Sequence, residues 1–147
     1  MDPGRPSTRY TKLEALGRQL ILEYYGCPAE KLNDASFVEE VMVAAAESMG
    51  AHIVCVNFHQ FNPHGVSGAV VISESHLTIH TWPEYGYAAV DVFTCGTVID
   101  PWEAHAFLKE RFGATRESTV EFRRGSFDVA PGTLPSAYGV TRDDLDK

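Results

Sequence analysis

Apolar positions recur along this chain with two different periods. In one segment, residues 33–50, they fall at Phe37, Val41, Ala45 and Met49, a spacing of four residues that is typical of a helix packed by one face. In other segments they alternate with polar residues or form short β-branched runs, which is typical of strands. This pattern predicts strands at residues 17–25, 52–58, 68–73, 76–82, 87–93 and 115–122.

A second helix is predicted from its end signals. Asp100 precedes a proline at the first helical position, and Gly113 stands where a helix commonly stops. In the first helix, Ser36 and Glu39 have the spacing of a capping box, which predicts that Ser36 caps the helix.

The predicted order is strand, helix, four strands, helix, strand. Such an order favours an α+β two-layer sandwich in which both helices cover one face of a mainly antiparallel sheet. A chain of 147 residues without a long linker is expected to fold as a single domain, 1–147. The stretch from Gly125 onward, rich in Gly and Pro, is expected to be loosely ordered.

Charge and composition narrow the class of function. The chain is 44% hydrophobic and carries a formal net charge of −8, which opposes sequence-independent binding of nucleic acid. No apolar run approaches the roughly 20 residues needed to cross a bilayer, so no membrane partner is expected. The first twelve residues, MDPGRPSTRYTK, lack the apolar centre of a secretory signal, and a cytoplasmic location is the default expectation. Three cysteines without C-x-x-C spacing argue against a disulfide framework and a zinc knuckle.

Chemistry-bearing residues concentrate in residues 65–96, GVSGAVVISESHLTIHTWPEYGYAAVDVFTCG. Serines, histidines and a cysteine interrupt runs that otherwise predict buried strands, and such conflicts often mark functional sites. Strand alternation places His80 and Trp82 on the face opposite Leu77 and Ile79.

The usual motifs do not name a reaction. Ser73, Ser75 and His80 lack the G-x-S-x-G context of a hydrolase nucleophile. His76 and His80 share a face but lie about 13 Å apart along a strand, too far to bind one metal ion, so no metal site is expected. Phosphate-binding and dinucleotide-binding glycine motifs are absent from the sequence. The residues alone therefore indicate a candidate functional site but do not identify the reaction.

A resemblance to a known family supplies the reaction. The string VSGAVVISESHLTIHTWPEYGYAAVDVFTCG (66–96) closely resembles the bacterial and archaeal S-adenosylmethionine decarboxylase proenzymes. The likeness begins at LGRQLILEYYGC (16–27), continues through NFHQFNPHGVSG (57–68) and reaches DPW (100–102), so it covers more than half of the chain.

The resemblance implies that the chain cleaves itself. The Ser75 hydroxyl would attack the carbonyl of Glu74 to give an ester, and elimination and hydrolysis would leave a pyruvoyl group at the new N-terminus. Residues 1–74 would form the beta chain and residues 75–147 the alpha chain. The pyruvoyl cofactor, derived from Ser75, would form a Schiff base with the substrate amine and accept electrons as carbon dioxide leaves.

Three further roles follow from the resemblance. His80 and Ser67 are similar to residues that assist self-processing, and Cys95 is similar to the acid that reprotonates the substrate carbon. A thiol, with an unperturbed pKa near 8.5, can hold that proton at neutral pH.

A homodimer with shared sites is also expected. Ser75 and His80 lie five residues apart, about 16 Å along a strand, and the odd separation turns their side chains to opposite faces. Together with the resemblance, this predicts that one protomer lends Ser67 and His80 while its partner presents Ser75 and Cys95.

Substrate-binding residues are less sharply indicated. A purine needs flat stacking surfaces and a ribose or sulfonium group needs a carboxylate, so four residues are candidates: Phe61, Trp82, Tyr87 and Glu84. Cys27, Cys55, His52 and His105 are interpreted as structural.

Two alternatives to S-adenosylmethionine decarboxylation stay open at this stage. One keeps the pyruvoyl chemistry but takes arginine or ornithine, because the segment FHQFNPHG does not determine the shape of a pocket. The other is an inactive relative that serves as a regulatory or partner subunit, which the presence of Ser67, Ser75, His80 and Cys95 disfavours.

Overall fold

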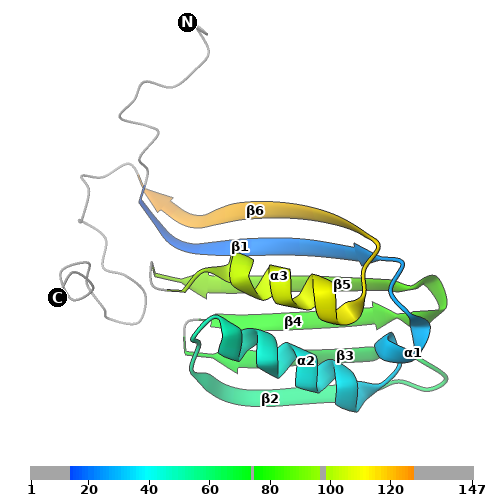
Figure 1. Cartoon of the computed structure of the whole chain (residues 1–147). Helices are drawn as coiled ribbons and strands as arrows, with labels where there is room; N and C mark the ends of the chain where they lie inside the picture. The colour runs from blue at the N-terminus through cyan, green and yellow to red at the C-terminus, as the bar shows by residue number, and fades with distance from the viewer. Residues whose placement is uncertain (1–13, 74, 97–98, 128–147) are drawn as a thin grey trace, which may run out of the picture.

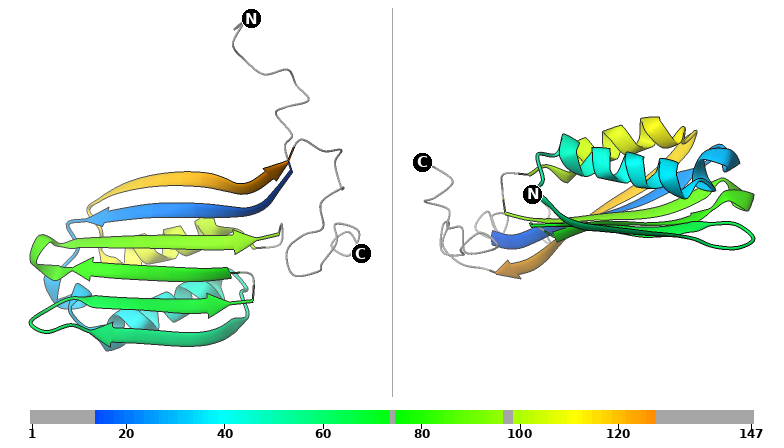
Figure 2. Two further views of the ribbon diagram at one scale, coloured as in Figure 1. Left: turned by 180° about the vertical axis from the view of Figure 1, so that it is seen from behind. Right: turned by 90° about the horizontal axis from the view of Figure 1, so that it is seen from below.

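The computed structural model describes residues 14–73, 75–96 and 99–127. Six strands form an antiparallel sheet with the order β2-β3-β4-β5-β1-β6, and two long helices lie on one of its faces (Figures 1 and 2). In chain order the elements are β1 (Glu14–Tyr25), α1 (Ala29–Leu32), α2 (Ala35–Ser48), β2 (Ile53–Gln60), β3 (Val66–Ile72), β4 (Ser75–Trp82), the 3₁₀ turn η2 (Pro83–Tyr85), β5 (Tyr87–Cys95), α3 (Pro101–Phe112) and β6 (Arg116–Phe127).

The predicted α+β two-layer architecture is confirmed. The short helix α1 was not predicted, and β1 begins at Glu14, three residues before the predicted start. The expectation of loose order from Gly125 is wrong for residues 125–127, which continue β6 as the pairing partner of β1; residues 128–147 lie outside the described ranges. Within the described residues, no helix is long and apolar enough to cross a membrane.

The predicted helix ends are partly right. Helix α3 begins after Asp100, whose side chain accepts a hydrogen bond from the backbone of Trp102, and it ends at Gly113 in the left-handed conformation. Helix α2 is capped by Asp34 and not by Ser36. Asp34 has an extended backbone and its carboxylate accepts from Phe37 N at 3.2 Å, so Ser36 already lies inside the first turn.

The core lies between the helices and one face of the sheet. Helix α2 packs over β2 and β3, and α3 packs over β1 and β5 (Figure 2). Strand alternation supplies the sheet side of this core, and the periodic positions of the two helices supply the other side. Its fully buried residues include Leu20, Leu22 and Tyr24 of β1, Leu77 and Ile79 of β4, Val38, Val41 and Met42 of α2, and Leu108 and Phe112 of α3.

The opposite face of the sheet carries no helix among the described residues (Figure 2). Because Leu77, Ile79 and Thr81 point into the core, the alternate residues of β4 point to this open face. The predicted placement of His80 and Trp82 away from the apolar face is therefore confirmed, and both side chains are exposed.

A buried threonine ties one end of the sheet to helix α1. Thr81 is 6% exposed; its hydroxyl donates to the carbonyl of Leu32 at 2.8 Å and accepts from the backbone N–H of Val66 at 2.8 Å. Both backbone groups belong to segments that border the candidate site. Thr81 thus holds the start of β3 and the end of α1 against β4.

Replacing Thr81 with valine should lower the free energy of unfolding by about 2 kcal/mol, because two buried backbone groups lose their partner while the shape is kept. We would measure chemical denaturation at fixed protein concentration in a Ser75→Ala background, in which the serine of the expected cleavage point is absent. Thr119→Val, on strand β6, is the matched control and should stay within about 0.5 kcal/mol of its parent. Equal stabilities for the two variants would contradict the role of Thr81.

Candidate active site

A serine and a histidine form a hydrogen-bonded pair on the open face. Ser67 of β3 and His80 of β4 are directly opposite in the register, and Ser67 Oγ lies 2.7 Å from His80 Nδ1. The two residues expected to assist self-processing are thus brought together within one protomer.

Stacked aromatic rings continue from this pair toward the end of the sheet. The Trp82 and Tyr87 rings stack with centroids 5.3 Å apart, and the Tyr25 ring stacks on Tyr87 at 5.3 Å. The Tyr87 hydroxyl donates to Glu23, and burial followed by this hydrogen bond raises the pKa of Tyr87. Two of the predicted substrate-binding residues therefore form a flat, partly exposed surface beside His80.

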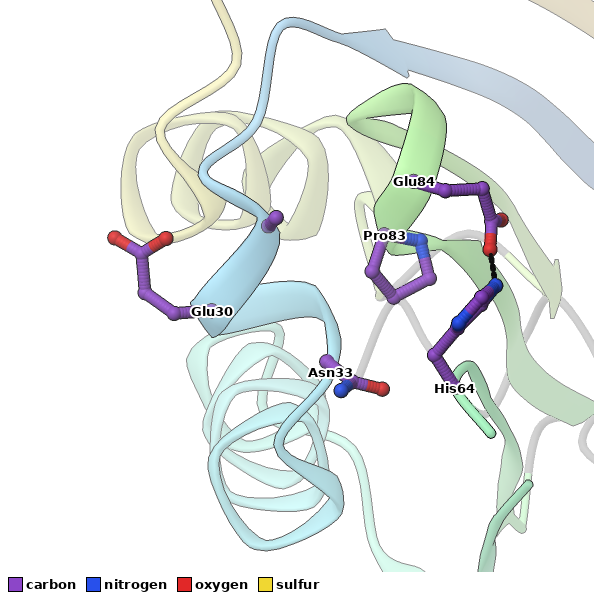
Figure 3. Close-up of a pocket in the computed structure, with 6 residues that line it drawn as sticks. Glu30, Asn33, His64, Pro83 and Glu84 are labelled. Atoms are coloured by element: carbon purple, nitrogen blue, oxygen red, sulfur yellow. Dashed lines mark ion pairs between the residues drawn. The ribbon is translucent and has the colours of Figure 1, made fainter. Parts of the chain in front are cut away.

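The other two candidates, Phe61 and Glu84, occupy the loops at this same end. Phe61 is 47% exposed and meets the His59 ring edge to face, with centroids 4.6 Å apart. Glu84, on η2, forms an ion pair with His64 of the β2–β3 turn (Figure 3). This pair lies at a hollow of about 250 Å³ that is lined by Ala29, Glu30, Asn33, His64, Pro83 and Glu84.

Sequence reasoning missed the residues that hold the β2–β3 turn in place. Asn33 Oδ1 accepts hydrogen bonds from Gly65 N at 2.9 Å and from Gln60 Nε2 at 3.1 Å. Gln60 Oε1 in turn accepts from Ala35 N at 3.1 Å, at the start of α2. These contacts fix the turn that carries Phe61 and His64. An asparagine between two helices gave no sequence signal for this task.

The remaining two reactive residues lie at the opposite end of the sheet. Ser75 begins β4 and pairs with Thr94 of β5, and Cys95 follows Thr94 as the last residue of that strand. Ser75 has a φ angle of 151°, which is unusual for a residue with a side chain. Glu74, the other side of the expected cleavage point, lies outside the described residues.

A glycine lets β1 approach Cys95. Gly17 is the register partner of Cys95, and a Cβ atom there would lie 2.8 Å from the carbonyl oxygen of Thr94 and 3.3 Å from Cys95 Sγ. Any larger residue would push β1 away from this corner. The half-buried thiol therefore lies in a crowded part of the sheet, where the Phe93 ring and the Thr94 carbonyl also approach β1.

The structure divides the predicted site into two groups. The first is the Ser67–His80 pair with its aromatic neighbours; the second is Ser75 with Cys95. Five strand residues, about 16 Å, separate Ser75 from His80 along β4. The imidazole that contacts Ser75 belongs instead to His76, whose Nδ1 lies 3.5 Å from Ser75 Oγ.

Two of the residues interpreted as structural, Cys27 and His105, are buried. Cys27 is buried, and burial raises its pKa to about 11, so the thiol stays protonated. His105 is a buried residue of α3; its Nδ1 is 2.8 Å from the Tyr24 hydroxyl, and burial lowers its pKa. Among the described residues, no cluster of three or more His, Cys, Asp or Glu side chains is arranged to bind a metal ion.

Comparison with known proteins identifies the family. A family model described as S-adenosylmethionine decarboxylase matches residues 18–125. The S-adenosylmethionine decarboxylase proenzyme of Carboxydothermus hydrogenoformans is 58% identical over 113 residues, covering 77% of this chain and 89% of the relative. The corresponding proenzyme of Thermotoga petrophila is 54% identical over 129 residues, covering 88% and 99%.

A solved structure agrees with these relatives. The crystal structure of the adenosylmethionine decarboxylase from Aquifex aeolicus matches with a TM-score of 0.73 and 31% identity, covering 76% of this chain and 92% of that one. The family model's range, residues 18–125, extends from β1 to β6 and includes both long helices. This chain belongs to the S-adenosylmethionine decarboxylase family.

Proposed function

We propose that this chain cleaves itself between Glu74 and Ser75 and then converts S-adenosylmethionine to S-adenosyl 3-(methylsulfanyl)propylamine and carbon dioxide. This reaction supplies aminopropyl groups for spermidine. The observation that carries the proposal is the grouping of the four reactive residues: a hydrogen-bonded Ser67–His80 pair at one end of β4, and Ser75 beside the strand of Cys95 at the other.

The processing roles follow from these two groups. Ser75 supplies the hydroxyl that attacks the carbonyl of Glu74, at a position where an uncommon backbone angle stores strain next to the bond to be broken. Ser67 and His80 move protons in the later elimination and hydrolysis. Their short hydrogen bond orients the imidazole on the open face.

The residues around Ser75 fit the cofactor that the family implies. A pyruvoyl group made from Ser75 would supply an electron-accepting carbonyl for a bound amine, and serine is its direct precursor. Cys95, one residue beyond the register partner of Ser75, is the group that would donate a proton to the substrate carbon. No metal ligand is required for these roles.

The aromatic surface and Glu84 suit the rest of the substrate. Trp82, Tyr87 and Phe61 offer ring faces for the adenine, and the carboxylate of Glu84 can meet a ribose hydroxyl or the sulfonium charge. Glu84 contacts His64 in the free protein. The net charge of −8 also favours the approach of a cationic substrate.

The proposed functional unit is a homodimer. Because Ser75 and His80 lie at opposite ends of β4, a second copy related by a two-fold axis can place its His80 near the first copy's Ser75. The open face is suited to this contact: it exposes large apolar side chains at Ile21, Val71, Trp82, Val120 and Phe122, up to 50% for Phe122. In such a dimer each site takes Ser67 and His80 from one protomer and Ser75 and Cys95 from its partner.

The family match favours S-adenosylmethionine over arginine or ornithine as substrate. The relatives described above carry the name S-adenosylmethionine decarboxylase proenzyme, and an amino acid without a purine would leave the aromatic surface unused. An inactive partner subunit is disfavoured because the reactive residues are retained. Measuring carbon dioxide release with S-adenosylmethionine, arginine and ornithine in turn discriminates among these three hypotheses.

Purified wild-type protein should give two fragments, one that ends at Glu74 and one that begins at position 75 without a free amine. Ser75→Ala should stay one chain, because the attacking hydroxyl is missing. Intact-mass measurement checks both outcomes. A wild-type chain that stays whole after long incubation at neutral pH would refute self-cleavage.

Cys95→Ala should still cleave itself but lose turnover by at least roughly 100-fold, because the proton donor to the substrate carbon is gone. Product analysis should also show protonation at the wrong atom. Cys55→Ala, the same change at an exposed cysteine, is the matched control and should turn over like wild type. Undiminished turnover of Cys95→Ala would remove Cys95 from its assigned role.

Mixed dimers test the shared site. Ser75→Ala and His80→Ala chains, each uncleaved alone, should be coexpressed with different tags and the mixed dimers purified. The His80→Ala chain should then be cleaved, because its Ser75 faces an intact histidine of the partner.

The control for this test pairs His80→Ala with a chain that carries both Ser75→Ala and His80→Ala. Such dimers contain no His80 and should stay whole. If the first kind of mixed dimer also stays wholly uncleaved, the two groups do not combine across protomers.

A further inference from the structure

An imidazole lies next to the cleavage serine within the same chain. His76 Nδ1 is 3.5 Å from Ser75 Oγ, at the outer limit of a hydrogen bond. Neighbouring residues of a regular strand point to opposite faces. Here the φ angle of 151° at Ser75 departs from a regular strand, and the contact between the two side chains is made at this first residue of β4.

The other nitrogen of His76 faces a carboxylate. His76 Nε2 lies 3.7 Å from Asp91 Oδ2 of β5, and both side chains are about one-third exposed, at 35% and 37%. The ring also meets Phe93 edge to face, with centroids 5.7 Å apart. A carboxylate beside Nε2 favours the tautomer with its proton on that nitrogen, which leaves Nδ1 able to accept a proton from Ser75.

Asp91 is itself held from both sides. Its Oδ1 accepts a hydrogen bond from Thr78 Oγ1 at 2.9 Å, and its Oδ2 accepts from Gln19 Nε2 at 3.3 Å. Thr78 lies on β4 and Gln19 on β1, so the strands on either side of β5 fix the carboxylate. The order Ser75, His76, Asp91 is thus that of a nucleophile, a base and a group that orients the base.

His80 does not take this place within the chain. Its Nδ1 is engaged by Ser67 at 2.7 Å, and it lies about 16 Å from Ser75 along β4. A histidine from the partner could act on later steps, but the hydroxyl of Ser75 already has a base in contact.

We propose that His76 is a catalytic residue of self-cleavage, as the base for the Ser75 hydroxyl, and that Asp91 positions it. This rests on the proposed self-cleavage. Ser75 Oγ forms a bond to the carbonyl carbon of Glu74 while its proton passes to His76 Nδ1. The C–N bond between Glu74 and Ser75 then breaks, and the imidazolium returns the proton to the departing nitrogen, which leaves an ester and a free amine. No oxidant or metal enters this step.

The test measures the rate of self-cleavage of purified, uncleaved protein by intact mass. His76→Ala should slow the first-order rate by at least roughly 100-fold, and added imidazole should restore much of it, because the small molecule can replace the missing base. Asp91→Asn should give a smaller loss that imidazole does not restore. His52→Ala is the matched control: this histidine is exposed and contacts the segment before Ser75 through its backbone carbonyl, which accepts from Ser73 N at 2.9 Å and is kept in alanine, so loss of the side chain should leave the rate unchanged.

His76→Gln serves as a second variant that keeps a polar side chain at this position. Circular dichroism and native mass spectrometry confirm that each variant is folded and assembled. Slow cleavage without imidazole rescue would assign His76 a merely structural role and overturn the inference. Wild-type rates for both His76 variants would do the same while leaving the proposed function intact. An intact wild-type chain, by contrast, would remove the proposed function itself.

Discussion

Strand β4 must bury Leu77, Ile79 and Thr81 under the helices, and the rest of the site depends on this constraint. A strand has two faces, so filling the core with alternate residues leaves His76, Thr78, His80 and Trp82 on the other face. A slip of one residue would reverse both sets at once, with polar side chains in the core. The register of the sheet and the arrangement of the reactive groups are therefore set by the same packing.

The same strand keeps the two groups of candidate residues apart within one protomer. Ser75 begins β4 and His80 lies near its end, and no bend in the strand brings them together. The apolar side chains that remain uncovered on the open face, Ile21 and Val120 among them, are costly in water unless another surface covers them. In the proposed homodimer, one symmetric contact would cover that face and bring the two groups together.

The fold was largely predictable from the sequence, and the candidate site residues followed from the resemblance, whereas the contacts among them could not be predicted. Alternation predicted which side of β4 carries His80, because a period of two leaves no choice. The Ser67–His80 hydrogen bond depends on the register between two strands, and the contact of His76 with Asp91 depends on a diagonal across β4 and β5. Neither the register between β3 and β4 nor the diagonal between β4 and β5 can be deduced from the residue types.

The sequence signals for the start of helix α2 were ambiguous because they too depend on tertiary structure. Asp34 and Ser36 both suit a helix cap, and the choice depends on how the chain leaves the short helix α1, which has too few residues to show a periodic pattern. Asn33 and Gln60 position the β2–β3 turn only because α1 brings them together across the fold. Such long-range polar contacts follow from tertiary structure and leave no mark on hydrophobic patterning.

The strand order also decides what becomes of the two halves of a cut chain. A break before Ser75 would leave β1, β2 and β3 on one fragment and β4, β5 and β6 on the other, yet β1 lies between β5 and β6 in the sheet. Three strand pairings therefore connect the two fragments: β3–β4, β5–β1 and β1–β6. Helix α2 of the first fragment also packs against α3 of the second. Separating them would require the whole sheet to unfold, so loss of one peptide bond changes the chemistry of the molecule without loosening its architecture.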